Sequence, residues 1–136
     1  MTIKHTIFCL FLAMTLSACD NTNKLPSNAT EHAVSGAYTA SLSDDGSLSL
    51  VSSVSHGLAL WDLNKNGLKY QWSHQQAEDN LVLSTDISFD KSVAISADKE
   101  NFALWDIATG GNIGFWKIKD SAIRDIAVSD QGRYVL

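Results

Sequence analysis

The side chains that could carry chemistry in this chain are four histidines, fifteen acidic residues and two cysteines. His32, His56 and His74 do not occur in pairs at the spacing that metal-binding histidines show, so we predict no metal site. The chain has neither a Gly-x-Ser-x-Gly nucleophile motif nor a glycine-rich phosphate loop. The acidic run at 77–80 is typical of an exposed loop. We therefore predict no catalytic residue and no cofactor.

Both cysteines lie near the N-terminus, where an apolar run of ten residues (7–16) follows Lys4. This run is too short to span a bilayer as a helix and suits an export signal, although a buried core helix is the alternative. The Leu-Ser-Ala-Cys that ends at Cys19 resembles the lipobox of bacterial lipoproteins. In that family a peptidase cuts before the Cys, whose sulfur carries a diacylglycerol. The resemblance implies a signal peptide at 1–18 and lipidation of Cys19; a secretory signal with an incidental Cys stays open.

A lipid-anchored protein of this kind would lie in the cell envelope, on the periplasmic side of the membrane. Asp20 retains some lipoproteins in the inner membrane, but the rule varies between bacteria, so inner and outer membrane both stay open. Residues 19–31 are polar, contain Pro26 and have no apolar period, which predicts a flexible tether. The net charge of −5 and the scattered basic residues argue against a nucleic-acid partner.

The rest of the chain must form the elements that hold any functional side chain, and its pattern is that of strands. Short apolar runs alternate with turn sequences such as Ser-Asp-Asp-Gly at 43–46, and no long amphipathic helical period occurs. We predict an all-β fold whose last strand starts near Arg133. The earlier strands are expected at 37–42, 47–54, 57–63, 68–72, 82–89, 92–97, 101–107, 112–118 and 122–128.

Two segments of the chain repeat each other. The sequence Ala-Leu-Trp-Asp ends at Asp62 and again at Asp106, and the residues before each copy also correspond. Val-Ser-Asp-Gln-Gly at 128–132 begins a third copy. A unit of about 40–45 residues with four strands has the period of a propeller blade.

These units resemble WD repeats. The family pattern runs from Gly-His through an Asp-Gly turn and a Ser-x-Asp strand end to Trp-Asp. Here Trp72-Ser-His74 stands for Gly-His, and Ser96-Ala-Asp98 stands for Ser-x-Asp. The resemblance covers about residues 32–136 and implies a partial β-propeller, with two four-stranded blades and the start of a third. Since ring-closed propellers usually need four to eight blades, we expect the N-terminal part of a longer propeller or a truncated product; short chains that assemble into one ring are the alternative.

The family's hydrogen-bonded structural tetrad can be carried over residue by residue. In the second unit the resemblance implies that Trp105 donates to Ser96, Ser96 to His74, and His74 to Asp98. In the first unit His32, Ser53 and Trp61 fit the pattern, but Ser55 and His56 occupy the place of the turn Asp. We expect this first tetrad to be incomplete.

The sequence at 104–116 is also similar to the repeat of pyrroloquinoline-quinone-type propellers, which carry a Thr-Gly turn with a Trp several residues later. That family includes outer-membrane protein assembly factors and quinoprotein dehydrogenases. The WD resemblance implies instead a non-enzymatic scaffold that presents a surface to an unidentified protein partner. Later units would separate the two hypotheses, and a decayed gene without a folded product is a third.

Overall fold

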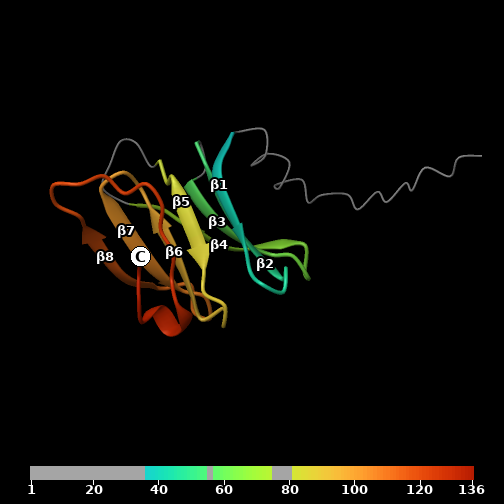
Figure 1. Cartoon of the computed structure of the whole chain (residues 1–136). Coiled ribbons are helices and arrows are strands. Elements are labelled where there is room, and N and C mark those ends of the chain that lie inside the picture. Colours follow the sequence, from blue (N-terminus) through green and yellow to red (C-terminus); the bar gives the residue numbers. More distant parts are fainter. Residues whose placement is uncertain (1–35, 55–56, 75–80) are drawn as a thin grey trace, which may run out of the picture.

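The computed structural model describes residues 36–54, 57–74 and 81–136 as two four-stranded antiparallel sheets followed by a short 3₁₀ helix, η1 (Asp130–Gly132). Figure 1 shows the two sheets side by side. Each sheet keeps its strands in chain order. The first sheet consists of β1 (Ala37–Leu42), β2 (Leu48–Ser53), β3 (Gly57–Asp62) and β4 (Gly67–Trp72). The second sheet consists of β5 (Ser84–Ile87), β6 (Val93–Ala97), β7 (Asn101–Asp106) and β8 (Asn112–Lys117).

The all-β prediction and its first eight strands are confirmed, with ends that differ by no more than two residues. The strand predicted at 122–128 and the one from Arg133 are wrong as strands. Only an isolated bridge between Val128 and Val135 forms there. The physical reason is that residues 122–127 lie against the second sheet mainly through side chains. Their backbone bonds to other backbone groups only at Ile123, which donates to the Lys99 carbonyl, and at Ala127, which pairs with Leu136, so no continuous ladder forms. The predicted segments 1–18 and 19–31, like His32 and Cys19, lie outside the described residues.

In each sheet an aspartate organises the turn between the first two strands. In the first sheet one carboxylate oxygen of Asp45 accepts from the Ser43 hydroxyl (2.8 Å) and from both the backbone N–H and the hydroxyl of Ser47. The Ser43 hydroxyl oxygen in turn accepts the backbone N–H of Leu48 at 2.9 Å. Gly46 completes the turn in the left-handed region (φ +66°), which glycine adopts without steric cost. This turn sets the register in which β1 and β2 pair.

The same turn recurs twice. Asp90 bonds Ser88 and Ser92 as Asp45 bonds its two serines. The Val93 N–H donates to the Ser88 hydroxyl at 3.1 Å, and the Tyr134 N–H donates to Ser129 at 2.9 Å. Residues 129–134 therefore begin a third unit in register with the first two.

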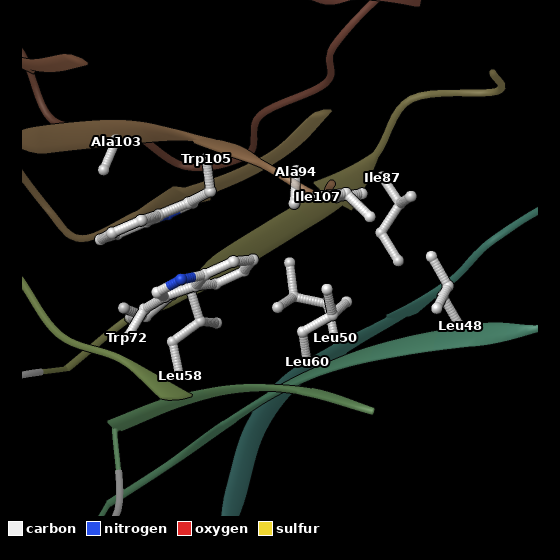
Figure 2. Packing of buried hydrophobic residues seen from close by; sticks show 11 residues of the cluster. Leu48, Leu50, Leu58, Leu60, Trp72, Ile87, Ala94, Ala103, Trp105 and Ile107 are labelled. Atoms are coloured by element: carbon white, nitrogen blue, oxygen red, sulfur yellow. The ribbon is translucent and has the colours of Figure 1, made fainter. Parts of the chain in front are cut away.

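The main core lies between the two sheets. In the first sheet Leu50, Leu58 and Leu60 are fully buried and point at the second sheet, where Ala94 and Ala103 are fully buried opposite them. Figure 2 shows these side chains on both sides of a stacked pair of indoles. The Trp72 and Trp105 rings lie 4.9 Å apart, with 10° between their planes. Because side chains alternate across a strand, every second residue faces the other sheet. The small alanines of the second sheet leave room there for the indole and the leucines of the first.

The opposite face of the second sheet is covered in part by the segment after β8. Ile123, Ile126 and Val128 pack over the buried Val93 and Ile95. Two side chains of β5 fix this segment. The Ser84 hydroxyl donates to Asp125 at 2.6 Å, and Asp86 accepts the Val128 N–H at 2.9 Å. The strand β7 is therefore covered on both faces at Ala103, Leu104 and Trp105, as its continuous apolar sequence predicts.

Candidate functional site

A chain of hydrogen bonds connects His74, Ser96, Asp98 and Trp105. The Trp105 indole N–H lies 2.8 Å from the Ser96 hydroxyl oxygen. The same oxygen lies 2.8 Å from His74 Nε2, and His74 Nδ1 lies 3.2 Å from Asp98 Oδ2. The structure thus brings together all four residues of the second unit that the sequence singled out.

The donors in this network follow from its chemistry. An indole N–H can only donate, so the Ser96 oxygen accepts from Trp105. The Ser96 hydrogen is then free to donate to His74 Nε2, which must be the unprotonated ring nitrogen. His74 therefore carries its proton on Nδ1 and donates it to Asp98. The donor or acceptor role of each of the four groups is therefore set by the groups beside it.

Burial sets the charge state of the network. His74 is 3% exposed, and its desolvation lowers its pKa below the usual 6.5, while the hydrogen bond and charge of Asp98 oppose this shift. Burial would raise the pKa of Asp98, but hydrogen bonds from the Asn101 side chain and from the backbone of Glu100 and Asn101 outweigh it, and the pKa is lowered. His74 is thus neutral at pH 7 with both nitrogens engaged. A histidine in this state suits a structural role rather than general-base catalysis or metal binding.

The first sheet differs at the corresponding positions. In the second sheet Trp105 pairs with Ala94, and Ser96 follows two residues later. In the first sheet Trp61 pairs with Ser49, and the residue two positions later is Val51. Ser53 lies two residues further along β2; it is buried, as is Trp61. The register therefore places a side chain without a hydroxyl where the second sheet has Ser96.

A second set of hydrogen bonds, which the sequence analysis missed, joins β4 to the turn after β7. Lys69 Nζ donates to the Ile107 carbonyl at 2.7 Å, and the Tyr70 hydroxyl donates to that of Ala108 at 2.8 Å. The Trp72 indole N–H donates to that of Gly110 at 2.9 Å. These three bonds form what we call the β4 clasp. It fixes the second sheet's turn relative to the first sheet.

Gly110 is required by the β4 clasp for two reasons. Its φ of +76° is strained for any residue with a side chain, and a Cβ there would come within 2.5 Å of the Tyr70 ring. The signal in the sequence was the Thr-Gly after the second Trp-Asp, together with the aromatic residues on the fourth strand. From the sequence alone, the Thr-Gly indicates a resemblance to a propeller family and does not indicate a contact between sheets.

Charged side chains also link successive turns. Lys91, at the tip of the β5–β6 turn, forms an ion pair with Asp45 of the first sheet and reaches the Ser47 hydroxyl at 3.3 Å. The Lys91 ammonium and the nearby serines hold the pKa of Asp45 well below its usual range. One turn further on, the Asp90 N–H donates to Asp130 at 3.0 Å. We call the surface formed by these turns (42–47, 63–66, 88–92 and 107–111) the turn face.

No metal centre is assembled in the described part of the chain. Within residues 36–54, 57–74 and 81–136 no group of three or more His, Cys, Asp or Glu could hold a metal ion. A surface hollow of about 370 Å³ on the turn face is lined by side chains of both charges, including Asp62, Lys69 and Lys91. No helix in the same residues is long and apolar enough to cross a bilayer. The geometry is that of a rigid frame with exposed turns.

Comparison with known proteins identifies the fold. No protein-family model and no curated protein sequence matches the chain. Solved structures do match: the β-propeller domain of Cps50 (Swd1) from Myceliophteria thermophila has 15% identity and a TM-score of 0.57 over 68% of this chain. The WD40 repeats of RRP9 have 12% identity and a TM-score of 0.54 over 68%. The hydrazine synthase of Kuenenia stuttgartiensis has 18% identity and a TM-score of 0.59 over 74%.

The chain spans 28% of the length of each of these three structures. Their likeness shows the fold: each sheet is one blade of a β-propeller, and residues 129–136 begin the next unit. The predicted partial propeller is thereby confirmed.

Proposed function

We propose that this protein is a lipid-anchored, non-enzymatic scaffold on the periplasmic side of a bacterial membrane, where it presents a protein-binding surface. The observation that carries the proposal is the interlock of the two blades. The Trp72–Trp105 stack, the β4 clasp and the Lys91–Asp45 ion pair all join the sheets beside the turn face. Turns held in this way keep their shape when a partner binds, which reduces the entropy lost on binding.

The turn face has features that suit a protein partner. Phe89 is 71% exposed in the second sheet's turn, and Leu42 and Leu63 are also exposed in the turns of the first sheet. Exposed apolar side chains among charged ones are typical of the centre and rim of protein interfaces. We therefore place the binding surface around Phe89.

Phe89→Asp tests this placement. The full chain is expressed with a C-terminal affinity tag, cross-linked in intact cells and purified from membranes. A defined partner is expected with the unmodified chain and lost with Phe89→Asp. Val54→Asp is the matched control, because Val54 is 51% exposed at the other end of β2. A partner that survives Phe89→Asp, or that Val54→Asp abolishes equally, would contradict the placement.

The anchor has its own test. Cells that express the chain are labelled with radioactive palmitate, and membrane and soluble fractions are compared. Cys19→Ala is expected to remove the label and release the protein from the membrane. Cys9→Ala is the control, because Cys9 lies in the apolar run and not at the end of the lipobox. Unchanged label in Cys19→Ala would remove the lipid anchor from the proposal.

The second candidate is a quinoprotein-like propeller, either an outer-membrane assembly factor or a dehydrogenase-type enzyme. Two observations favour it: the Thr109-Gly110 turn before Trp116, and the likeness to a structure named as a hydrazine synthase. Titration of the purified full chain with pyrroloquinoline quinone distinguishes the enzyme from the scaffold. The scaffold predicts no saturable binding and no dehydrogenase activity.

A further inference from the structure

The hollow of about 370 Å³ on the turn face is lined by both blades and has a balanced charge. Each blade contributes one acidic and one basic side chain to its lining. Asp62 and Lys69 come from the first blade, and Asp90 and Lys91 come from the second. Small-molecule sites in proteins start at about 300 Å³, so the hollow is large enough for a small ligand.

Two of these four charged side chains have no ion-pair partner. Lys69 Nζ donates to the Ile107 carbonyl at 2.7 Å, but it forms no ion pair with another described residue. Asp90 accepts hydrogen bonds from the serines of its own turn and likewise forms no ion pair within the described ranges. The other two are paired, Lys91 with Asp45 and Asp62 with Lys65. The hollow thus has one unpaired positive charge from the first blade and one unpaired negative charge from the second.

This arrangement of charges selects against a ligand with a single charge. Such a ligand meets as many like charges as opposite ones in the lining, so attraction and repulsion nearly cancel. A small zwitterion avoids the repulsion, because each of its two charges can lie against the opposite charge of the protein. Its carboxylate would accept from Lys69, and its ammonium would donate to Asp90. Hydrogen bonds between charged groups are stronger than those between neutral ones.

The floor of the hollow is apolar. Leu48 of β2 and Ile107 after β7 are almost fully buried and line the hollow together with the exposed Ala108. Figure 2 shows Leu48 and Ile107 on opposite sheets of the core. An aliphatic group placed on this floor would lose contact with water and gain contact with all three side chains, which favours binding.

We propose that the hollow binds a free α-amino acid with an aliphatic side chain. The carboxylate of the amino acid accepts from Lys69, its ammonium donates to Asp90, and its side chain covers the apolar floor. A small-molecule site of this kind goes beyond the scaffold function. It depends on neither the lipid anchor nor a protein partner at Phe89.

Titration of the purified full chain with three related compounds tests the proposal by calorimetry. L-leucine carries both charges, N-acetyl-leucine lacks the ammonium, and leucinamide lacks the carboxylate. We expect saturable binding of leucine, with each single-charge compound weaker by about tenfold or more. Glycine keeps both charges but lacks the aliphatic group, and we expect it to bind about tenfold more weakly than leucine. Absence of saturation with leucine, or equal binding of either single-charge compound, overturns the proposal.

Substitutions assign each charge of the ligand to its partner. Lys69→Met should remove the preference for leucine over leucinamide, and Asp90→Asn should remove the preference for leucine over N-acetyl-leucine. Lys119→Met is the matched control, because Lys119 also forms no ion pair with a described residue but follows β8 at its far end. Preferences that survive both changes, or that Lys119→Met removes, place the site elsewhere and overturn the proposal. The comparison of ligands on the unmodified chain remains decisive if a variant does not fold.

A zwitterionic lipid headgroup carries the same two kinds of charge and must be distinguished from an amino acid. In glycerophosphoethanolamine the ammonium and the phosphate are separated by two carbons and there is no aliphatic side chain. We expect it to bind more weakly than leucine. Tighter binding of glycerophosphoethanolamine than of leucine would overturn the assignment to an amino acid.

Discussion

The third strands of the two blades contain the same four residues, Ala-Leu-Trp-Asp, but they are supported differently. In the second blade the Trp105 indole donates to Ser96, and further hydrogen bonds link Ser96 to His74 and His74 to Asp98. In the first blade Val51 takes the register position of Ser96. The same Trp-Asp strand therefore marks both blades, while the register of the neighbouring strand decides which residue stands at the position of Ser96.

Replacement of Trp105 is expected to have the largest effect. Trp105→Ala removes the stack on Trp72 and the bond to Ser96, and it leaves a cavity between the sheets. Large-to-small changes of buried aromatic residues cost about 3–5 kcal/mol of the free energy of unfolding. Urea unfolding of the full chain measures this cost. Trp116→Ala is the control, because that ring is 43% exposed, and we expect it to cost about 1 kcal/mol or less. Equal costs would contradict the account of the core.

Exchange of the residues at the two equivalent register positions tests this difference directly. Ser96→Val gives the second blade the residue of the first, and leaves the Trp105 N–H and His74 Nε2 buried without their partner. A buried polar group that loses its bond costs about 1–3 kcal/mol. Val51→Ser is the reciprocal change, and we expect an effect within about 0.5 kcal/mol, because Val51 is only half-buried. The two free energies of unfolding come from the same urea titration. If Val51→Ser cost as much, the blades would not differ as described.

The β4 clasp provides the next test. Gly110→Ala places a methyl group at φ +76° and within 2.5 Å of the Tyr70 ring. Gly46→Ala is a matched control, because its φ is +66° but nothing lies within 4 Å of the added Cβ. Strain alone predicts a cost of about 1 kcal/mol for the control. We expect Gly110→Ala to exceed it by about 1 kcal/mol, measured by thermal unfolding. Equal losses would show that Tyr70 moves aside freely.

Most of the fold could be predicted from the sequence because its signals are local. The Ser-x-Asp turns, the apolar strands and the Trp-Asp repeat each define an element within a few residues, and eight strands were placed correctly. The ninth was not, because an apolar run becomes a strand only when a neighbour pairs with its backbone. Residues 122–127 contact the second sheet through Ile123, Ile126 and Asp125 instead.

The candidate site was predictable only in part, for a related reason. The resemblance named His74, Ser96, Asp98 and Trp105, which the structure places in one network. The resemblance could not give the register of β2 against β3, because the first unit has one more residue between its Asp-Gly turn and its Trp than the second unit has. It also gave no account of the β4 clasp, because a bond from Trp72 to the Gly110 carbonyl joins two units and has no signature within either.

The smallest expected effect is the dependence of stability on pH through His74. Burial lowers its pKa in the folded chain below the usual 6.5, so on acidification the unfolded chain takes up the proton first. The contribution of His74 to stability is therefore complete above about pH 6.5 and is lost as the pH falls towards its folded pKa. The carboxyl of Asp98, whose folded pKa lies below 3.8, adds its own loss only in a separate, more acidic window. His74→Gln is expected to reduce the slope of unfolding free energy against pH between about pH 7.5 and 5.5, although it also lowers stability overall. Because the other three histidines are present in both proteins, the difference between the two slopes isolates His74. An identical slope in His74→Gln would mean that the second blade's network tolerates a charged imidazole, and that its difference from the first blade is one of packing alone.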